Sequence, residues 1–348
     1  MTTVRADPAQ PEQGTNTRRP LWRRVFVRPE TGSLVGAVAV FVFFFAVATP
    51  FRQLDSFATV LYSAAVLGIM AVAVGLLMIG GEFDLSAGVA VTTSAITAAI
   101  LSYQLTLNVW VGVFFALVVS LAVGFFNGYV VIKTGIPSFL VTLGTFLMLQ
   151  GANLAVTRLV TGTVSTQRIS DMDGYASLEA IFASEWTVGG VRIRVLVLWW
   201  LLFVAIATWV LLRTRVGNWI FAVGGNKDSA RAVGVPVARV KIGLYMTVGF
   251  AAWFVGMHLL FSLHTVQAGE GVGNEFEYII AAVIGGCLLT GGYGSAVGAG
   301  LGAFIFGMAK QGIVFAGWNP DWYWTFLGAM LLLATLMNMY VRRLAAKR

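Results

Sequence analysis

The stretch Ile79-Gly80-Gly81-Glu82-Phe83-Asp84-Leu85-Ser86-Ala87-Gly88 places two carboxylates and three glycines between two long apolar runs. A charged side chain near the bilayer centre costs at least about 2.5 to 3.5 kcal/mol, so such residues usually face a cavity, a pathway or another protein. Asp84 has a simpler explanation, because its carboxylate can cap a helix that begins at Leu85. Glu82 has no such explanation. We therefore treat Glu82, Asp84 and the adjacent Ser86 as candidates for the lining or the gate of a pathway.

The composition around this stretch is that of a membrane protein. Of 348 residues, 58% are hydrophobic and 11% are charged, which leaves too little polar surface to cover a soluble globule. Apolar runs of about bilayer-crossing length recur ten times. They lie at 34–50, 58–80, 87–103, 109–132, 138–157, 194–213, 242–264, 277–290, 296–316 and 323–341. We predict an all-α, polytopic transmembrane helical bundle of about ten spans, in which 87–103 and 277–290 are short enough to be broken or re-entrant.

The distribution of charge predicts the orientation and the domain limits. If both termini are cytoplasmic, 17 of the 23 basic residues lie inside and five outside, as the positive-inside rule expects. The basic charge is thus topological, and no nucleic-acid partner is expected. We predict a flexible basic cytoplasmic tail at 1–33, a transmembrane domain at 34–341 and a basic cytoplasmic tail at 342–348. The domain would carry a large outer loop at 158–193 and a large inner loop at 214–241.

The inner loop contains a short amphipathic helix in this interpretation, ended by Gly234 and Pro236. It is either a helix that rests on the membrane surface or a docking element for a cytosolic partner. The candidate docking residues are Asn226, Ala230, Arg231, Gly234 and Val235.

Two glycine-rich segments resemble each other. Ile79-Gly80-Gly81 is echoed by Ile284-Gly285-Gly286, and membrane transporters are often built from such repeats. After the second copy, Gly294, Gly298 and Gly302 recur every four residues, a pattern that lets transmembrane helices pack closely.

A polar stripe marks the fifth apolar run, where Gln150, Asn153 and Thr157 share one helical face. These side chains either hold helices together by hydrogen bonds or line a polar pathway.

The chemistry of an enzyme is missing. There is no Gly-Lys dipeptide and hence no Walker-type phosphate loop, and no Gly-x-Ser-x-Gly, HExxH or CxxC motif. Cys287 is the single cysteine, and His258 and His264 fall on different helical faces, so no metal site and no cofactor are expected. Ionisable residues are also scarce within spans. These absences favour a translocator that is passive or externally driven over an enzyme.

Four blocks of the chain, from about residue 58 to 341, resemble the permease subunit of ribose/xylose-type sugar ABC importers, a family related to branched-chain amino-acid permeases. Gly80 to Gly88 is similar to its GG-x-DLS-x-G motif with one extra residue, and Pro137 to Thr145 to its P-x-F-(I/V)-x-TLG-(T/M) motif. Ala222 to Val235 resembles its A-(I/V)-G-G-N-x-x-A-A-R-x-x-G-I segment, and Gly271 to Gly294 its last glycine-rich block. Cys287-Leu288-Leu289 stands where the family has Thr-Ser-Leu, so the resemblance names no particular sugar.

The resemblance implies a permease in the bacterial plasma (inner) membrane that works with a cytosolic ABC ATP-binding subunit and an extracytoplasmic sugar-binding protein. It further implies a homodimer or a paralogous heterodimer in contact with membrane lipid, with residues 226–235 as the coupling element. ATP hydrolysis would occur in the partner subunit. The alternative is a stand-alone, ion-coupled secondary carrier or channel for a small polar solute.

Overall fold

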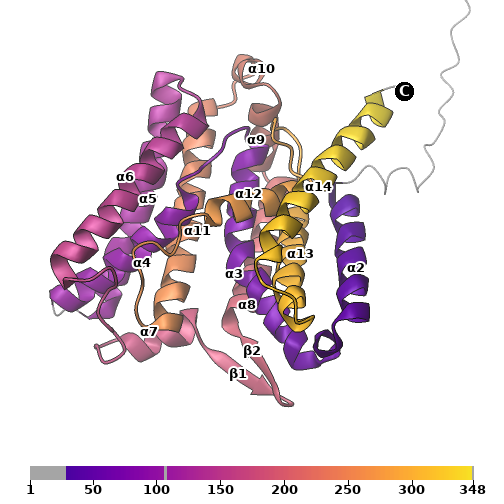
Figure 1. Cartoon of the computed structure of the whole chain (residues 1–348). Coiled ribbons are helices and arrows are strands. Elements are labelled where there is room, and N and C mark those ends of the chain that lie inside the picture. Colours follow the sequence, from indigo (N-terminus) through magenta and orange to yellow (C-terminus); the bar gives the residue numbers. More distant parts are fainter. Residues whose placement is uncertain (1–28, 106–107, 347–348) are drawn as a thin grey trace, which may run out of the picture.

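The computed structural model describes the backbone of residues 29–105 and 108–346, and the side chains of residues 30–105 and 108–336. Over these ranges the protein is a helical bundle with one short hairpin (Figure 1). The elements in chain order are α2 (Pro29–Val47), the 3₁₀ turn η1 (Thr49–Arg52), α3 (Leu54–Ile79), α4 (Ala87–Gln104), α5 (Val109–Thr134), α6 (Ser138–Thr161), α7 (Tyr175–Phe182), β1 (Glu185–Val188), β2 (Val191–Arg194), α8 (Val195–Arg213), α9 (Arg215–Gly225), α10 (Lys227–Ala232), α11 (Val237–Leu263), α12 (Asn274–Ile284), α13 (Ala296–Phe315) and α14 (Trp322–Ala346).

Each of the ten predicted apolar runs corresponds to a helix, so the predicted all-α membrane bundle is confirmed. Within the described residues, seven helices are long and apolar enough to cross a membrane, namely α2, α3, α5, α6, α8, α11 and α13. The remaining three are α4, α12 and α14, whose described apolar part is Trp322–Leu336. With 11 residues, α12 is only about 17 Å long and cannot cross a hydrocarbon core of about 30 Å.

Two terminal helices extend beyond their predicted limits. α2 begins at Pro29, inside the predicted tail 1–33, because proline is well suited to the first position of a helix. The rest of that tail lies outside the described residues. α14 continues to Ala346, inside the predicted tail 342–348, since no glycine or proline stops it and Arg, Leu and Ala favour helix.

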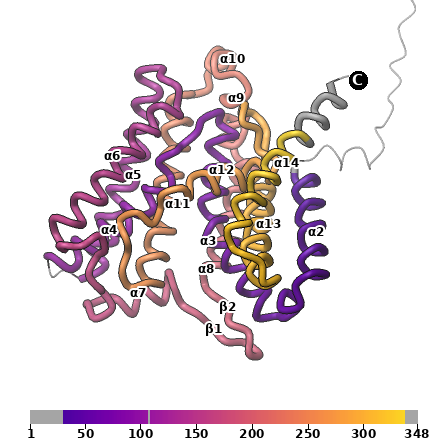
Figure 2. The backbone as a smooth tube through the Cα atoms, viewed as in Figure 1, coloured from indigo at the N-terminus to yellow at the C-terminus, as the bar shows by residue number. Residues whose placement is uncertain are grey.

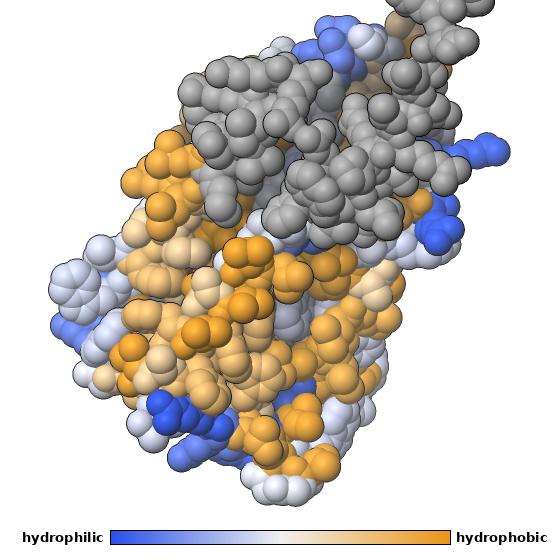
Figure 3. Space-filling view, turned by 90° about the vertical axis from the view of Figure 1, so that its right-hand side faces the viewer, coloured by the Kyte–Doolittle hydropathy of each residue, from blue (hydrophilic) through white to orange (hydrophobic). Residues whose placement is uncertain are grey.

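Helix α3 lies at the centre of the bundle. It packs against α13, α8, α11 and α12, and most of its residues are buried. α6 lies at the edge, where Phe139, Leu147, Met148 and Leu159 are exposed. On the side formed by α2 and α14, apolar residues cover the middle of the visible surface and polar residues gather at its lower end (Figure 3). Such a belt is what a surface in contact with lipid requires.

The two ends of the bundle carry different elements (Figure 1). The start of α2, the end of α14 and the helices α9 and α10 lie at one end, which we call the α10 end. Helix α7 and the β1–β2 hairpin lie at the other, the α7 end. The predicted inner loop, 214–241, holds two helices where one was predicted, and the predicted outer loop, 158–193, holds a hairpin that was not predicted. Gly189 and Gly190, both with positive φ, form its two-residue turn.

Candidate functional site

The helix breaks at the two glycine repeats have the same local structure. At the end of α3, the amides of Gly80, Gly81 and Glu82 donate to the carbonyls of Leu76, Met78 and Leu77. At the end of α12, the amides of Gly285, Gly286 and Cys287 donate to Ala281, Val283 and Ala282 in the same order. Gly81 has φ 83° and Gly286 φ 90°, a conformation that glycine adopts without strain. The sequence echo therefore encodes a common helix end.

The segment after α3, residues 80–86, runs from the α10 end back into the bundle, where α4 begins (Figure 2). A chain of polar side chains holds it there. The Asp84 Oδ1 accepts hydrogen bonds from the Ser86 amide (2.8 Å) and the Ser86 hydroxyl (2.6 Å). The Asn127 side-chain Nδ2 donates to the Ser86 hydroxyl (2.9 Å), and the Thr145 hydroxyl donates to the Asn127 side-chain Oδ1 (2.7 Å).

Asp84 is therefore not the helix cap that its position suggested. α4 begins at Ala87 with Ser86 at the cap position, and the Asp84 carboxylate instead closes a turn onto Ser86. Both Asp84 and Ser86 are buried, at 3% and 0% exposed. They hold the segment in place and are not open to solvent in this conformation.

Side chains from α6 and α11 satisfy the backbone of the same segment. The Phe83 amide donates to the Ser138 hydroxyl (3.2 Å) and the Leu85 amide to the Thr142 hydroxyl (3.0 Å). The Tyr245 hydroxyl donates to the Phe83 carbonyl (3.1 Å). A buried, non-helical backbone needs such partners, because an unpaired amide or carbonyl is costly to bury.

Glu82 has an ionic partner in the structure. Its carboxylate accepts from the Lys241 ammonium, on the first turns of α11, and both side chains are buried. The pair joins the helix break after α3 to α11, the helix that follows α10.

Three glycine segments meet at the α10 end. A Cβ on Gly224, in α9, would lie 1.8 Å from the carbonyl oxygen of Ile79 and 2.7 Å from the amide nitrogen of Gly292. The Gly292 amide itself donates to the Ile79 carbonyl (2.8 Å). We call this contact of α9 with the end of α3 and with the loop after α12 the glycine junction. Only glycine allows the three backbones to approach so closely.

The short helix predicted in the inner loop is present as α10. Asn226 caps it, with its carboxamide oxygen accepting from the amides of Asp228 (3.0 Å) and Ser229 (2.9 Å). Gly234 has φ 85° and follows the helix, and Val235 is half-buried. Ala230 is only 3% exposed because it packs against this chain, so it is not placed to contact a partner directly. Arg231 and Val233 are exposed instead.

The predicted packing glycines contact α12, but not as one stripe. A Cβ on Gly298 would lie 2.0 Å from the Gly285 carbonyl oxygen, and one on Gly302 would lie 2.0 Å from that of Ala281. Gly294 lies before α13, which begins at Ala296, and faces Cys287 and Ile79. The four-residue spacing thus spans a loop and a helix.

The three polar residues predicted to share one face of α6, Gln150, Asn153 and Thr157, also differ in their environments. Asn153 is buried and donates to the Val89 carbonyl in α4 (3.4 Å), and Thr157 is also buried. Gln150 is only half-buried. Asn153 therefore joins two helices, while Gln150 is the most accessible of the three.

Sequence reasoning missed Lys241, Asn127, Ser138, Thr142 and Thr145 as part of this network. The last three recur at helical spacing within the Pro137 to Thr145 block, a polar face that was visible in the sequence. Lys241 and Asn127 gave no such signal, because each is an isolated polar residue whose partner lies far along the chain.

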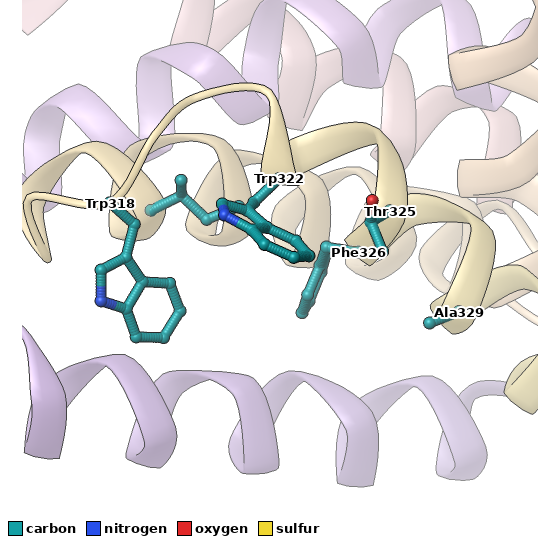
Figure 4. Close-up of a pocket in the computed structure, with 6 residues that line it drawn as sticks. Trp318, Trp322, Thr325, Phe326 and Ala329 are labelled. Carbon is teal, nitrogen blue, oxygen red and sulfur yellow. The ribbon is translucent and has the colours of Figure 1, made fainter.

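An apolar pocket of about 470 Å³ lies away from this network, between α2, α13 and α14 (Figure 4). Trp318, Trp322 and Phe326 line it, and Phe44 of α2 lies beside it, with its ring 6.5 Å from Trp318 and 6.4 Å from Phe326. Its lining offers a polar solute almost no hydrogen bonds, so the pocket suits a lipid chain better.

Comparison with known proteins places the chain among transport permeases. A family model described as the permease component of branched-chain amino acid transport systems matches residues 56–335. The ribose import permease of Escherichia coli (strain K12) is 28% identical over 324 residues, which cover 91% of this chain and 96% of that protein. The fructose import permease of Rhizobium meliloti is 28% identical over 287 residues (82% and 78%), and an inner membrane ABC transporter permease of Escherichia coli (strain K12) is 32% identical over 278 residues (79% and 80%). No solved structure gives a significant match.

Proposed function

The chain belongs to the permease component family of branched-chain amino acid transport systems, and from that premise we propose that it is the permease subunit of an ABC importer for a monosaccharide or a similar small polar solute. The substrate class is supported by relatives that import ribose and fructose and align over most of their length. The protein's role is transport and not catalysis. ATP would be hydrolysed by a separate cytosolic subunit.

The proposed assembly has a partner at each end of the bundle. The ATP-binding subunit docks on α10 and the adjoining end of α9, at the cytoplasmic face. An extracytoplasmic sugar-binding protein delivers the solute at the α7 end. Both termini are cytoplasmic in the inner membrane, two permease chains form a homodimer or a paralogous heterodimer, and lipid covers the outer helices.

The observation that carries the proposal is the glycine junction. Because Gly224 of α9 touches both the end of α3 at Ile79 and the loop after α12 at Gly292, any displacement of α9 and α10 acts directly on the first helix break and on the loop that follows the second. The Glu82–Lys241 pair adds a second link, from the start of α11 to the first break. Closure of the ATP-binding subunits would push α10 and shift both breaks together, which opens the path to one side and then the other.

The test is to disrupt the exposed face of α10 without disturbing its packing. Val233 is 79% exposed and Arg231 is also exposed, so we expect Arg231→Glu and Val233→Asp to reduce co-purification of the ATP-binding subunit and to abolish uptake. A hydrogen bond from a charged donor contributes about 1.5 to 3 kcal/mol, so Arg231→Glu should weaken binding at least about tenfold. Both variants should insert and fold normally.

Arg192→Glu is the matched control, since it reverses a charge on the exposed hairpin at the α7 end and should leave the ATP-binding subunit attached. Ala230→Trp serves as a different control, because Ala230 is buried against this chain and the change should unfold α10 itself. Unchanged co-purification in both α10 variants would refute the docking role. ATP-independent uptake by the chain alone in proteoliposomes would favour the secondary carrier.

A further inference from the structure

The connector between α11 and α12, residues 264–273, has no helix along its length and runs from the α7 end to the middle of the bundle (Figure 2). There it contacts the start of α4. A Cβ on Gly88, in the first turn of that helix, would lie 2.4 Å from the Gly271 carbonyl oxygen. The connector, which comes from the α7 end, thus ends against the start of α4, the helix into which segment 80–86 leads from the α10 end.

One side of the connector is bound to the rest of the chain. The Ala268 amide donates to the Val164 carbonyl (2.9 Å), and the Thr166 amide donates to the Val266 carbonyl (3.0 Å). Val266 and Ala268 are 0% and 2% exposed. These contacts fix the connector along its length and decide which of its side chains point inward.

The other side of the connector is open. Gln267, Gly269 and Glu270 are exposed, in alternation with the buried Val266 and Ala268. Together with Leu263 and Thr265, these three line a cavity of about 530 Å³.

This open side cannot face lipid. Non-helical backbone at membrane depth occurs only where it is buried in protein or lines a water-filled cavity, and a carboxylate is expensive in hydrocarbon. We propose that the α11–α12 connector lines the outer half of the translocation path, with Thr265, Gln267 and Glu270 as contacts for the solute. The inference rests on the proposed function, since it names the path that this function requires.

The chemistry of these three side chains selects a class of solute. A hydroxyl and a carboxamide each donate and accept, and a carboxylate accepts only. That set matches a neutral molecule with several hydroxyl groups, such as a monosaccharide. Glu270 disfavours an anion in the same place.

The first experiment measures accessibility in intact cells with an impermeant thiol reagent. We expect Gln267→Cys and Glu270→Cys to react. Ala268→Cys is the matched control, because it is an adjacent residue that is buried, and Leu147→Cys on the exposed face of α6 is the control for lipid contact. The unaltered chain, whose single cysteine Cys287 is 1% exposed, is the blank.

Reaction at 267 and 270 but not at 268 or 147 is the expected pattern. If 267 and 270 are as unreactive as the controls, lipid or protein covers the connector and the inference is wrong.

The second experiment tests whether Glu270 faces the same space as Gln267. A carboxylate roughly 6 Å away in water raises the local concentration of a monovalent cation about threefold and lowers that of an anion equally. At Gln267→Cys, a cationic thiol reagent should therefore react faster than an anionic one of equal size. Adding Glu270→Gln should reduce that preference by up to about tenfold. A preference that Glu270→Gln leaves unchanged would remove Glu270 from the path.

Neither labelling experiment depends on uptake, so the proposed transport function and the proposed role of the connector can be refuted independently. Labelling as expected without any ATP-dependent sugar uptake would overturn the proposed function and leave the water-filled path. Uptake with an unreactive connector would keep the function and move the path elsewhere in the bundle.

Discussion

Glu82 and Lys241 form an ion pair in which both side chains are buried, with exposed fractions of 10% and 8%. They are separated by 159 residues. Glu82 lies in the segment that follows the end of α3, and Lys241 lies in the first turns of α11, at the last position of the loop predicted at 214–241. The pair therefore joins the two parts of the chain that must move together if docking at α10 is to open a path.

We expect removal of either charge of the Glu82–Lys241 pair to destabilise the protein more than removal of both charges together. Glu82→Gln or Lys241→Met alone leaves one buried charge unpaired and should cost about 3 to 5 kcal/mol. The double variant should recover most of that loss, because two neutral side chains need no ionic partner. Thermal unfolding midpoints of the four purified proteins in detergent measure the coupling. Losses that simply add in the double variant would mean that the two residues act independently.

Asp84 should tolerate the loss of its charge but not the loss of its acceptor. One oxygen, Oδ1, accepts both bonds from Ser86, and the amide oxygen of asparagine can accept the same two. Asp84→Asn should therefore assemble and support uptake, whereas Asp84→Ala should be less stable by about 1 to 3 kcal/mol. Uptake assays of both variants at equal expression make the comparison. Loss of uptake in a stable Asp84→Asn protein would show that the charge itself gates transport.

The glycine junction predicts opposite outcomes for two adjacent glycines. Gly224→Ala places a methyl group 1.8 Å from the Ile79 carbonyl oxygen and must separate α9 from the helix breaks. A Cβ on Gly225 would meet no atom from other parts of the chain within 4 Å. We expect Gly224→Ala to cost at least about 1 to 3 kcal/mol and to abolish uptake, and Gly225→Ala to be nearly neutral. Equal behaviour of the two variants would contradict the close contact.

The orientation of the bundle can be tested at its two ends. Val188 is exposed at the hairpin, so Val188→Cys should react with an impermeant thiol reagent in intact cells. Arg239→Cys, exposed near the α10 end, should react only after the membrane is permeabilised. The reason is the excess of basic residues in the segments assigned to the cytoplasm. The reverse pattern would invert the topology.

The sequence by itself determined the class of fold and the position of nearly every helix. Hydropathy is a property of neighbouring residues, so the ten apolar runs could be located without knowing how they pack. Local chemistry also predicted α10, because its amphipathic pattern and the terminating Gly234 and Pro236 lie within the same short stretch. The echo of Ile79-Gly80-Gly81 at Ile284-Gly285-Gly286 was readable for the same reason, since a helix end is built from consecutive residues.

Only the tertiary structure decided which polar residues meet. Nothing near Glu82 in the sequence indicates Lys241, and nothing near Ser86 indicates Asn127, because these contacts depend on how α5 and α11 cross the broken helices. The same holds for burial. Ala230 looked like a contact for a partner and is covered by its own chain, while Glu270 faces a cavity because the connector turns one edge inward. Amphipathic spacing says which residues share a face, but only packing determines what that face touches.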